Sequence, residues 1–190
     1  MKILKRILLT VIAVSALCVA FRGWIYRHTV TYRSVGQRPL YAATEPALLK
    51  FIRSDTGKEA PPDIEKIVDI SLSKTSGHLR FSASRRDTDP NKLIHAKTAH
   101  CVGYAAFFAT TCNDLLEQYG LSDTWTAIPQ IGQLYLFGKN VHGYFNTPFF
   151  NDHDFVVVRN KSTGETIAVD PSVHDYLYIE RVTFCGEKGK

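Results

Sequence analysis

The sequence is poor in cysteine, and its cysteines do not have the spacing of a metal or dithiol site. Its 190 residues include only Cys18, Cys101, Cys112 and Cys185, with no CxxC or CxxH pair. Cys18 lies in the apolar N-terminal run, so three cysteines remain for the folded part. Because three is an odd number, at least one thiol should stay unpaired even in an oxidising compartment. Pairing of Cys112 with Cys185 stays open.

The absence of several well-known sequence motifs narrows the range of possible functions further. The sequence has no phosphate loop, dinucleotide fingerprint, HExxH or GxSxG motif, so we expect no bound cofactor and no metal. The net charge is +5, but the basic residues are scattered and form no stripe with interleaved aromatics. We therefore expect no nucleic-acid partner. A content of 45% hydrophobic and 22% charged residues is typical of a globular chain, and no internal repeat is present.

The one long uncharged run lies at the N-terminus. A short basic start is followed by fifteen uncharged residues, 7–21, a pattern typical of a secretory signal and short for a membrane span. Cleavage after Ala20 and retention as a membrane anchor both stay open. Cys18 does not fit a lipoprotein site, because Leu17 precedes it where a small residue is expected. We assign residues 1–21 to a signal peptide or anchor, 22–42 to a polar tether, 43–185 to one domain and 186–190 to a tail.

Helical patterns fill the first half of that domain. One helix is predicted from an N-cap at Thr44 to a stop at Asp55–Gly57, and a second runs from Pro61 to about Ser76. The stretch 79–97 is polar and irregular, apart from a short helical turn around residues 93–94. The third helix extends over about residues 100–119 and ends at Gly120.

Strand patterns fill the second half. They are predicted over 125–128, 133–137, 153–159 and 165–170, with a hairpin turn at 161–164 and an aromatic loop at 143–150. Helices followed by an antiparallel sheet predict an α+β domain, in which the third helix packs on the sheet.

Cys101 stands at the start of the third helix. Thr98 or His100 is the expected N-cap, so the thiol falls in the first turn. Unpaired backbone N–H groups and the positive end of the helix dipole favour an anion there and lower the pKa of a thiol. A buried structural cysteine is the alternative, since cysteine is among the most buried residue types.

The hairpin suggests a partner for this thiol. With a turn near 161–164, residues whose numbers sum to about 323 should be paired, which places His153 opposite Asp170 on one face of the ladder. A carboxylate beside an imidazole is the base-and-orienter half of a catalytic triad. An exposed cross-strand ion pair is the alternative.

Other polar residues are weaker candidates. Asp152 and Asp154 flank His153, but strand alternation turns both away from it, so no metal cluster is expected. His174 and Asp175 are expected in a surface loop after Pro171. Four single histidines have no partner by spacing: His78, His95, His100 and His142.

Three motifs in order resemble the transglutaminase-like branch of the papain-type cysteine enzymes. They are HCVGYA at 100–105, HDFVV at 153–157 and AVDPS at 168–172. The resemblance covers about residues 60–180 and implies a papain/transglutaminase-like core in a bacterial exported or membrane-anchored protein. It implies Cys101 as nucleophile, His153 as general base and acid, and Asp170 as orienter.

Three departures from the family pattern argue against a protein-crosslinking transglutaminase. Val102 and Phe155 stand where tryptophan is common, and Ala99 stands where glycine is common. A cysteine peptidase, amidase or small acyltransferase fits better. It would form a thioester, with the backbone N–H of Cys101 as one oxyanion donor and His95 or Gln130 as candidates for the second.

The expected substrate is a protein or peptide of the cell envelope, in the periplasm or at the periplasmic face of the inner membrane. The alternative is a catalytically inactive transglutaminase-like module that binds an envelope partner through the aromatic loop 143–150.

Overall fold

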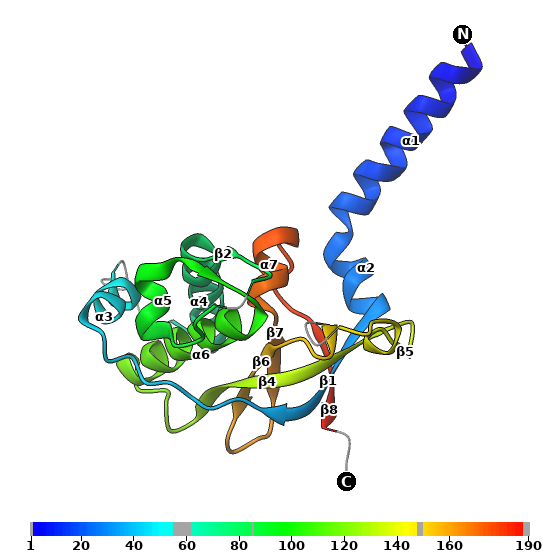
Figure 1. Cartoon of the computed structure of the whole chain (residues 1–190). Helices are drawn as coiled ribbons and strands as arrows, with labels where there is room; N and C mark the ends of the chain where they lie inside the picture. Colours follow the sequence, from blue (N-terminus) through cyan, green and yellow to red (C-terminus); the bar gives the residue numbers. More distant parts are fainter. Residues whose placement is uncertain (1, 55–61, 85, 148–149, 188–190) are drawn as a thin grey trace.

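The computed structural model describes residues 2–54, 62–84, 86–147 and 150–187 (Figure 1). The helices are α1 (Lys2–Ala20), α2 (Arg22–Thr29), α3 (Pro46–Arg53), α4 (Ile64–His78), α5 (Pro90–Ala96), α6 (Cys101–Gln118) and α7 (Pro171–Leu177), with a 3₁₀ turn η1 (His142–Tyr144). The strands are β1 (Val30–Gln37), β2 (Arg80–Phe81), β3 (Thr98–Ala99), β4 (Trp125–Leu136), β5 (Lys139–Asn140), β6 (Phe155–Asn160), β7 (Thr166–Val169) and β8 (Thr183–Glu187). The α+β class predicted from the sequence is confirmed.

The main sheet has the strand order β7-β6-β4-β1-β8, with β5 paired to β4. The predicted sheet was antiparallel throughout, but β1 and β8 are parallel, so the sheet is mixed. The two strands expected at 125–128 and 133–137 are one strand, β4. It continues through Pro129 because the carbonyl of that residue still accepts a hydrogen bond from the Arg38 N–H, at 3.0 Å.

The segment 22–42 is not the tether expected from its polarity. Residues 22–29 are helical, and residues 30–37 form β1, which lies between β4 and β8 inside the sheet. The reason is visible in the burial of β1, where only Tyr32 and Ser34 are buried. With one buried aromatic residue, the alternation of apolar and polar residues along β1 is too weak to predict a strand. That residue, Tyr32, nevertheless packs in the core and holds the strand in place.

The predicted helices are present with changed ends. His100 caps α6, and Gly120 follows it with a φ of +69°, a left-handed conformation that glycine adopts without strain. Asp63 caps α4 by accepting a hydrogen bond from Lys66 N–H. The N-cap of α3 is Glu45 and not Thr44, and the predicted stop at 55–57 lies outside the described residues.

Helices α3 to α7 gather on one side of the strands in Figure 1. Most of the core lies between α3–α6 and this side of the sheet, where Val156 and Val158 of β6 point. A second, smaller cluster on the other face holds Tyr32, Phe155 and Val157. Successive β6 side chains therefore enter opposite clusters, as a strand covered on both faces requires.

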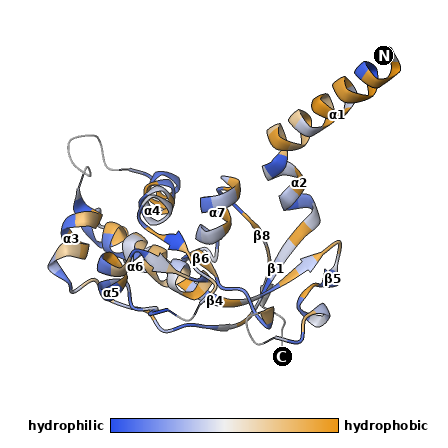
Figure 2. Ribbon diagram, turned by 45° about the horizontal axis from the view of Figure 1, so that its top comes forward, coloured by the Kyte–Doolittle hydropathy of each residue, from blue (hydrophilic) through white to orange (hydrophobic). Residues whose placement is uncertain are grey.

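Helix α1 extends away from the domain (Figures 1 and 2). Its window Ile3–Ala20 has a mean hydropathy of 2.2, and none of it is buried in the domain. This helix is long and apolar enough to cross a membrane and is equally compatible with a signal sequence.

Candidate active site

Cys101 is the first residue of α6, where the sequence placed it. The helix is buried along almost its whole length, so its N-terminus is fixed by packing against the core. The thiol itself is partly buried. The side chains of His100 and His153 and the backbone N–H of Asp154 lie near it and favour its ionised form. The sulfur is thus surrounded by groups from His100, the N-cap of α6, and from the segment just before β6.

His153 and Asp170 meet, although their predicted register is wrong. The observed pairs, such as Val156 with Val169, sum to 325 and not 323, so the predicted pairing is shifted by two residues. A shift of two keeps every side chain on the same face, because the side-chain period of a strand is two. His153 lies just before β6 and reaches diagonally to Asp170, with Nε2 2.5 Å from Oδ2.

This contact fixes how the imidazole is used. Since Nε2 faces Asp170, Nδ1 is the nitrogen left for the hydrogen bond to the Cys101 sulfur. The Cys101 thiol, the His153 imidazole and the Asp170 carboxylate therefore lie in sequence. The sequence prediction of these three residues as one cluster agrees with the geometry.

Asp170 is fully buried and accepts hydrogen bonds on both oxygens. Oδ1 accepts from the Ser172 N–H at 3.0 Å, the Ser172 hydroxyl at 2.7 Å and the Val173 N–H at 3.1 Å, which makes Asp170 the N-cap of α7. Oδ2 accepts from His153 and, at 2.8 Å, from the Tyr32 hydroxyl. Charge-assisted bonds of this number hold the carboxylate as an anion in one orientation.

The electrostatics favour a thiolate–imidazolium pair. Burial opposes ionisation of Cys101, but its bonds to His100 and His153 outweigh it and lower its pKa from 9.0 to about 7. Burial likewise opposes a charged His153, but the Asp170 carboxylate outweighs it and raises the pKa of His153 well above 6.5. Burial disfavours the Asp170 anion, yet the charge of His153 keeps the pKa of Asp170 below its usual value.

Gly132 on β4 allows His153 to approach the sheet. The His153 N–H donates to the Gly132 carbonyl at 2.9 Å. A Cβ at position 132 would lie 2.6 Å from the His153 carbonyl oxygen and 2.6 Å from the Phe155 ring. Any larger residue must therefore displace the segment that carries the imidazole.

Arg38 lies beside this centre and holds the two aspartates that flank His153. Its guanidinium contacts Asp154 at 2.8 and 3.1 Å and Asp152 at 3.3 Å. The ion pairs of both aspartates are with Arg38, whereas His153 pairs with Asp170. Asp154 is buried, and burial raises its pKa even though Arg38 opposes that change.

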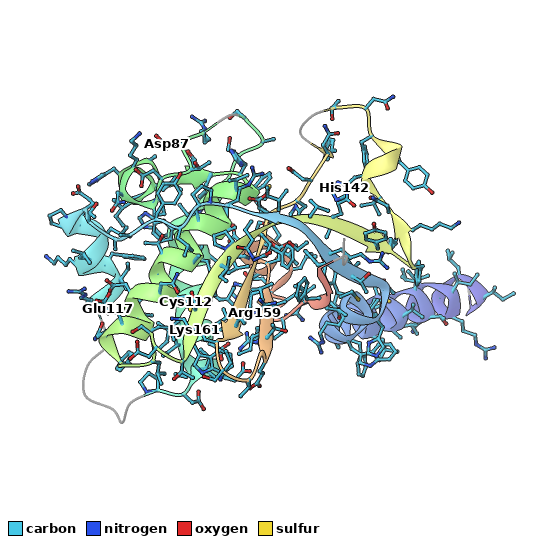
Figure 3. All side chains as sticks on the ribbon, turned by 90° about the horizontal axis from the view of Figure 1, so that it is seen from below. Asp87, Cys112, Glu117, His142, Arg159 and Lys161 are labelled. Atoms are coloured by element: carbon cyan, nitrogen blue, oxygen red, sulfur yellow. The ribbon has the colours of Figure 1, made fainter. Side chains whose placement is uncertain are left out.

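The remaining candidates lie elsewhere or have other partners. His95 contacts Glu45 at 3.4 Å, and the Gln130 amide donates to the Ile128 carbonyl at 3.1 Å. His142 in the loop after β5 accepts from the Leu134 N–H, far from Cys112 on α6 in Figure 3. Cys112 is fully buried, and burial raises its pKa to about 12.

The pair His174–Asp175 was expected in a surface loop, but it belongs to helix α7. Asp175 accepts a hydrogen bond from the buried Tyr104 at 2.7 Å, and His174 contacts Ser76 at 3.2 Å. Among the residues that the structure describes, no group of three or more histidine, cysteine or acidic side chains is arranged to hold a metal. All four cysteines are unpaired, including Cys112 and Cys185.

Sequence reasoning missed Tyr32, Arg38 and the role of His100. Tyr32 and Arg38 lie in the segment taken for a tether, so no element placed them near the site. The β-branched and aromatic run Val30-Thr31-Tyr32 was the available signal for a strand. His100 was recognised only as a possible cap, and it both caps α6 and contacts the thiol.

Comparison of the chain with protein-family models, with curated proteins and with solved structures gives no match in any of the three.

Proposed function

We propose that this chain is a thiol enzyme that cleaves or transfers acyl groups at amide bonds through a Cys-His-Asp triad. The observation that carries the proposal is the continuous contact from the Cys101 thiol through His153 to the buried Asp170. A structural cysteine at a helix start would need neither the imidazole nor a carboxylate with five donors. The three motifs, which follow one another in the order HCVGYA, HDFVV and AVDPS, support a papain/transglutaminase-like core.

In the proposed mechanism the Cys101 thiolate attacks the substrate carbonyl carbon, and the carbonyl π electrons move to oxygen. The backbone N–H of Cys101 stabilises the oxyanion. The oxyanion then collapses, the C–N bond breaks, and the His153 imidazolium gives its proton to the leaving amine. Water or a second amine, deprotonated by His153, resolves the thioester and regenerates the thiol.

The proposed location is the cell envelope, with the domain exported to the periplasm or anchored in the inner membrane. Helix α1 supports it, since its apolar window of 18 residues, Ile3–Ala20, has no buried part and therefore no role in the core. Arg22 ties the base of this helix to the domain by donating to the Leu177 carbonyl, at 2.6 Å. The proposed substrate is a protein or peptide of the envelope.

A second candidate function is partner binding without catalysis. Exposed aromatic residues after β5 favour it: Tyr144 is 74% exposed, and the Phe145 and Phe150 rings lie 4.7 Å apart at the surface. Such residues suit a protein interface. They suit the rim of an enzyme's substrate cleft equally well.

Alkylation of the thiols with iodoacetamide, quantified for each cysteine by mass spectrometry, separates the two functions. The expected rate at Cys101 is half-maximal near pH 7, and Cys112 should react only on unfolding. At pH 6.5 a thiol of pKa 7 is about 24% ionised against about 1% for an ordinary thiol, which leaves about a fivefold rate advantage after its lower nucleophilicity. A Cys101 that reacts no faster at pH 6.5 than the exposed Cys185 contradicts the enzyme proposal.

A further inference from the structure

A chain of two tyrosine hydroxyls ends on the carboxylate of the proposed triad. Tyr32 of β1 donates to Asp170 Oδ2 at 2.8 Å, and the hydroxyls of Tyr26 and Tyr32 are 2.5 Å apart. A phenol has one proton to donate. Because the proton of Tyr32 is directed at Asp170, Tyr26 must be the donor to Tyr32. The direction of the chain is therefore fixed as Tyr26 to Tyr32 to Asp170.

This chain is not needed to position the carboxylate. The three donors on Oδ1, from Ser172 and Val173 at the start of α7, already fix its orientation. Tyr32 instead binds Oδ2, the same oxygen that holds His153. Because Tyr32 is a second donor on that oxygen, it withdraws negative charge from the bond to the imidazole. Tyr26, which donates to the Tyr32 hydroxyl, strengthens this effect.

We infer that Tyr32 and Tyr26 limit the basicity of His153, so that the imidazolium can release its proton to the leaving group. The inference rests on the proposed function. A general acid works best when its pKa is near the working pH, and Asp170 alone pushes His153 away from that range. The other charged or titratable groups around the centre are His100 and Arg38, which act on Cys101, and Asp152 and Asp154, which pair with Arg38.

The position of Tyr26 in the chain connects the proposed triad to the N-terminal apolar helix. Tyr26 belongs to α2, which directly follows the apolar helix α1. The segment beside the export or anchor helix therefore contributes to the hydrogen bonding of the triad. Cleavage after Ala20 would leave Tyr26 in the mature chain.

The test is the pH profile of Cys101 alkylation in the full chain carrying Tyr32→Phe. Without the hydroxyl, Oδ2 stabilises the imidazolium more strongly, which in turn stabilises the thiolate. The midpoint of alkylation should fall by about half a pH unit or more in Tyr32→Phe, and by less in Tyr26→Phe. Tyr104→Phe is the matched control, because Tyr104 is equally buried and its hydroxyl also donates to a carboxylate, that of Asp175 at 2.7 Å.

An unchanged midpoint in Tyr32→Phe, or one that moves to higher pH, overturns the inference. If Tyr32→Phe does not fold, Tyr26→Phe decides alone, since Tyr26 is only partly buried, and its unchanged midpoint is equally decisive. Failure of the proposed function looks different, because the midpoint of the unmodified chain would then lie near that of an ordinary thiol.

Discussion

Replacing Asp170 with asparagine tests the proposed triad at its most constrained atom pair. Both carboxylate oxygens face donors, three on Oδ1 and two on Oδ2. An asparagine must point its NH₂ group at one of these sets. If the NH₂ takes the place of Oδ2, His153 can pair with it only through an unprotonated Nε2. The imidazole proton is then on Nδ1, the nitrogen that faces the thiol. A protonated Nδ1 cannot accept the proton of the Cys101 thiol.

The size of the effect follows from the chemistry of the nucleophile. In a serine triad this change costs about 10⁴ in rate, because the serine depends on the base for every proton it loses. The pKa of Cys101 is about 7, and His100 and the Asp154 N–H contribute to it without Asp170. A loss of about 10²–10³ in the acylation rate is therefore expected.

Asp170→Asn should also cost stability, because one buried donor set loses its acceptor, at about 1–3 kcal/mol. The pKa of Asp170 is lowered in the folded chain, so its contribution is complete above about pH 4, the ordinary aspartate value, and is lost as the pH falls further. The stability gap between Asp170→Asn and the unmodified chain should narrow below that pH.

The assay is the burst of p-nitrophenol released from p-nitrophenyl acetate, a small ester that can form the thioester, together with denaturant unfolding at several pH values. The control is Asp123→Asn, which changes an exposed aspartate. Equal burst rates for folded Asp170→Asn and the unmodified chain would remove Asp170 from the site. A stability gap that stays constant down to pH 2 would show that the carboxylate is not held as an anion.

Two further predictions concern the surroundings of the proposed triad, and a third concerns helix α1. Gly132→Ala should slow Cys101 alkylation at pH 6.5 severalfold through the clash with the His153 carbonyl, whereas Gly143→Ala, where a Cβ meets nothing within 4 Å, should not. Asp154→Asn should lower the free energy of unfolding by about 1–3 kcal/mol because it breaks a buried bond to Arg38, and denaturant unfolding measures it. Cell fractionation should find the chain in the membrane or exported fraction, and full-length protein in the cytoplasm would contradict the role of α1.

The proximity of Cys101, His153 and Asp170 could be predicted from the sequence because each stands at the end of an element with a strong local signal. The helix that begins at Cys101 has a long apolar pattern and a glycine stop, and the hairpin has a turn between two β-branched runs. The register was wrong by two residues, because a turn predicts pairing only approximately. The predicted contact is nevertheless present, because a shift of two residues leaves His153 and Asp170 on the same face of the sheet.

The supporting residues could not be predicted, because they come from distant segments that lack such signals. Tyr32 is 138 positions from Asp170, and Arg38 is 116 positions from Asp154. A single buried aromatic on a polar strand gives no periodicity to detect. Pairing with β4 and β8 brings β1 to the site, and strand pairing over such separations is a tertiary property.

Burial also changes which substitutions are informative. The sequence turns Asp154 away from His153 by strand alternation and places Asp175 in a surface loop, which predicts that neither carboxylate matters to the site. Asp154 is buried against Arg38, and Asp175 accepts the proton of a buried tyrosine. A loss of activity in either variant would therefore report lost packing as readily as lost chemistry. Only a variant that separates the midpoint of Cys101 ionisation from the free energy of unfolding can assign a residue to the triad.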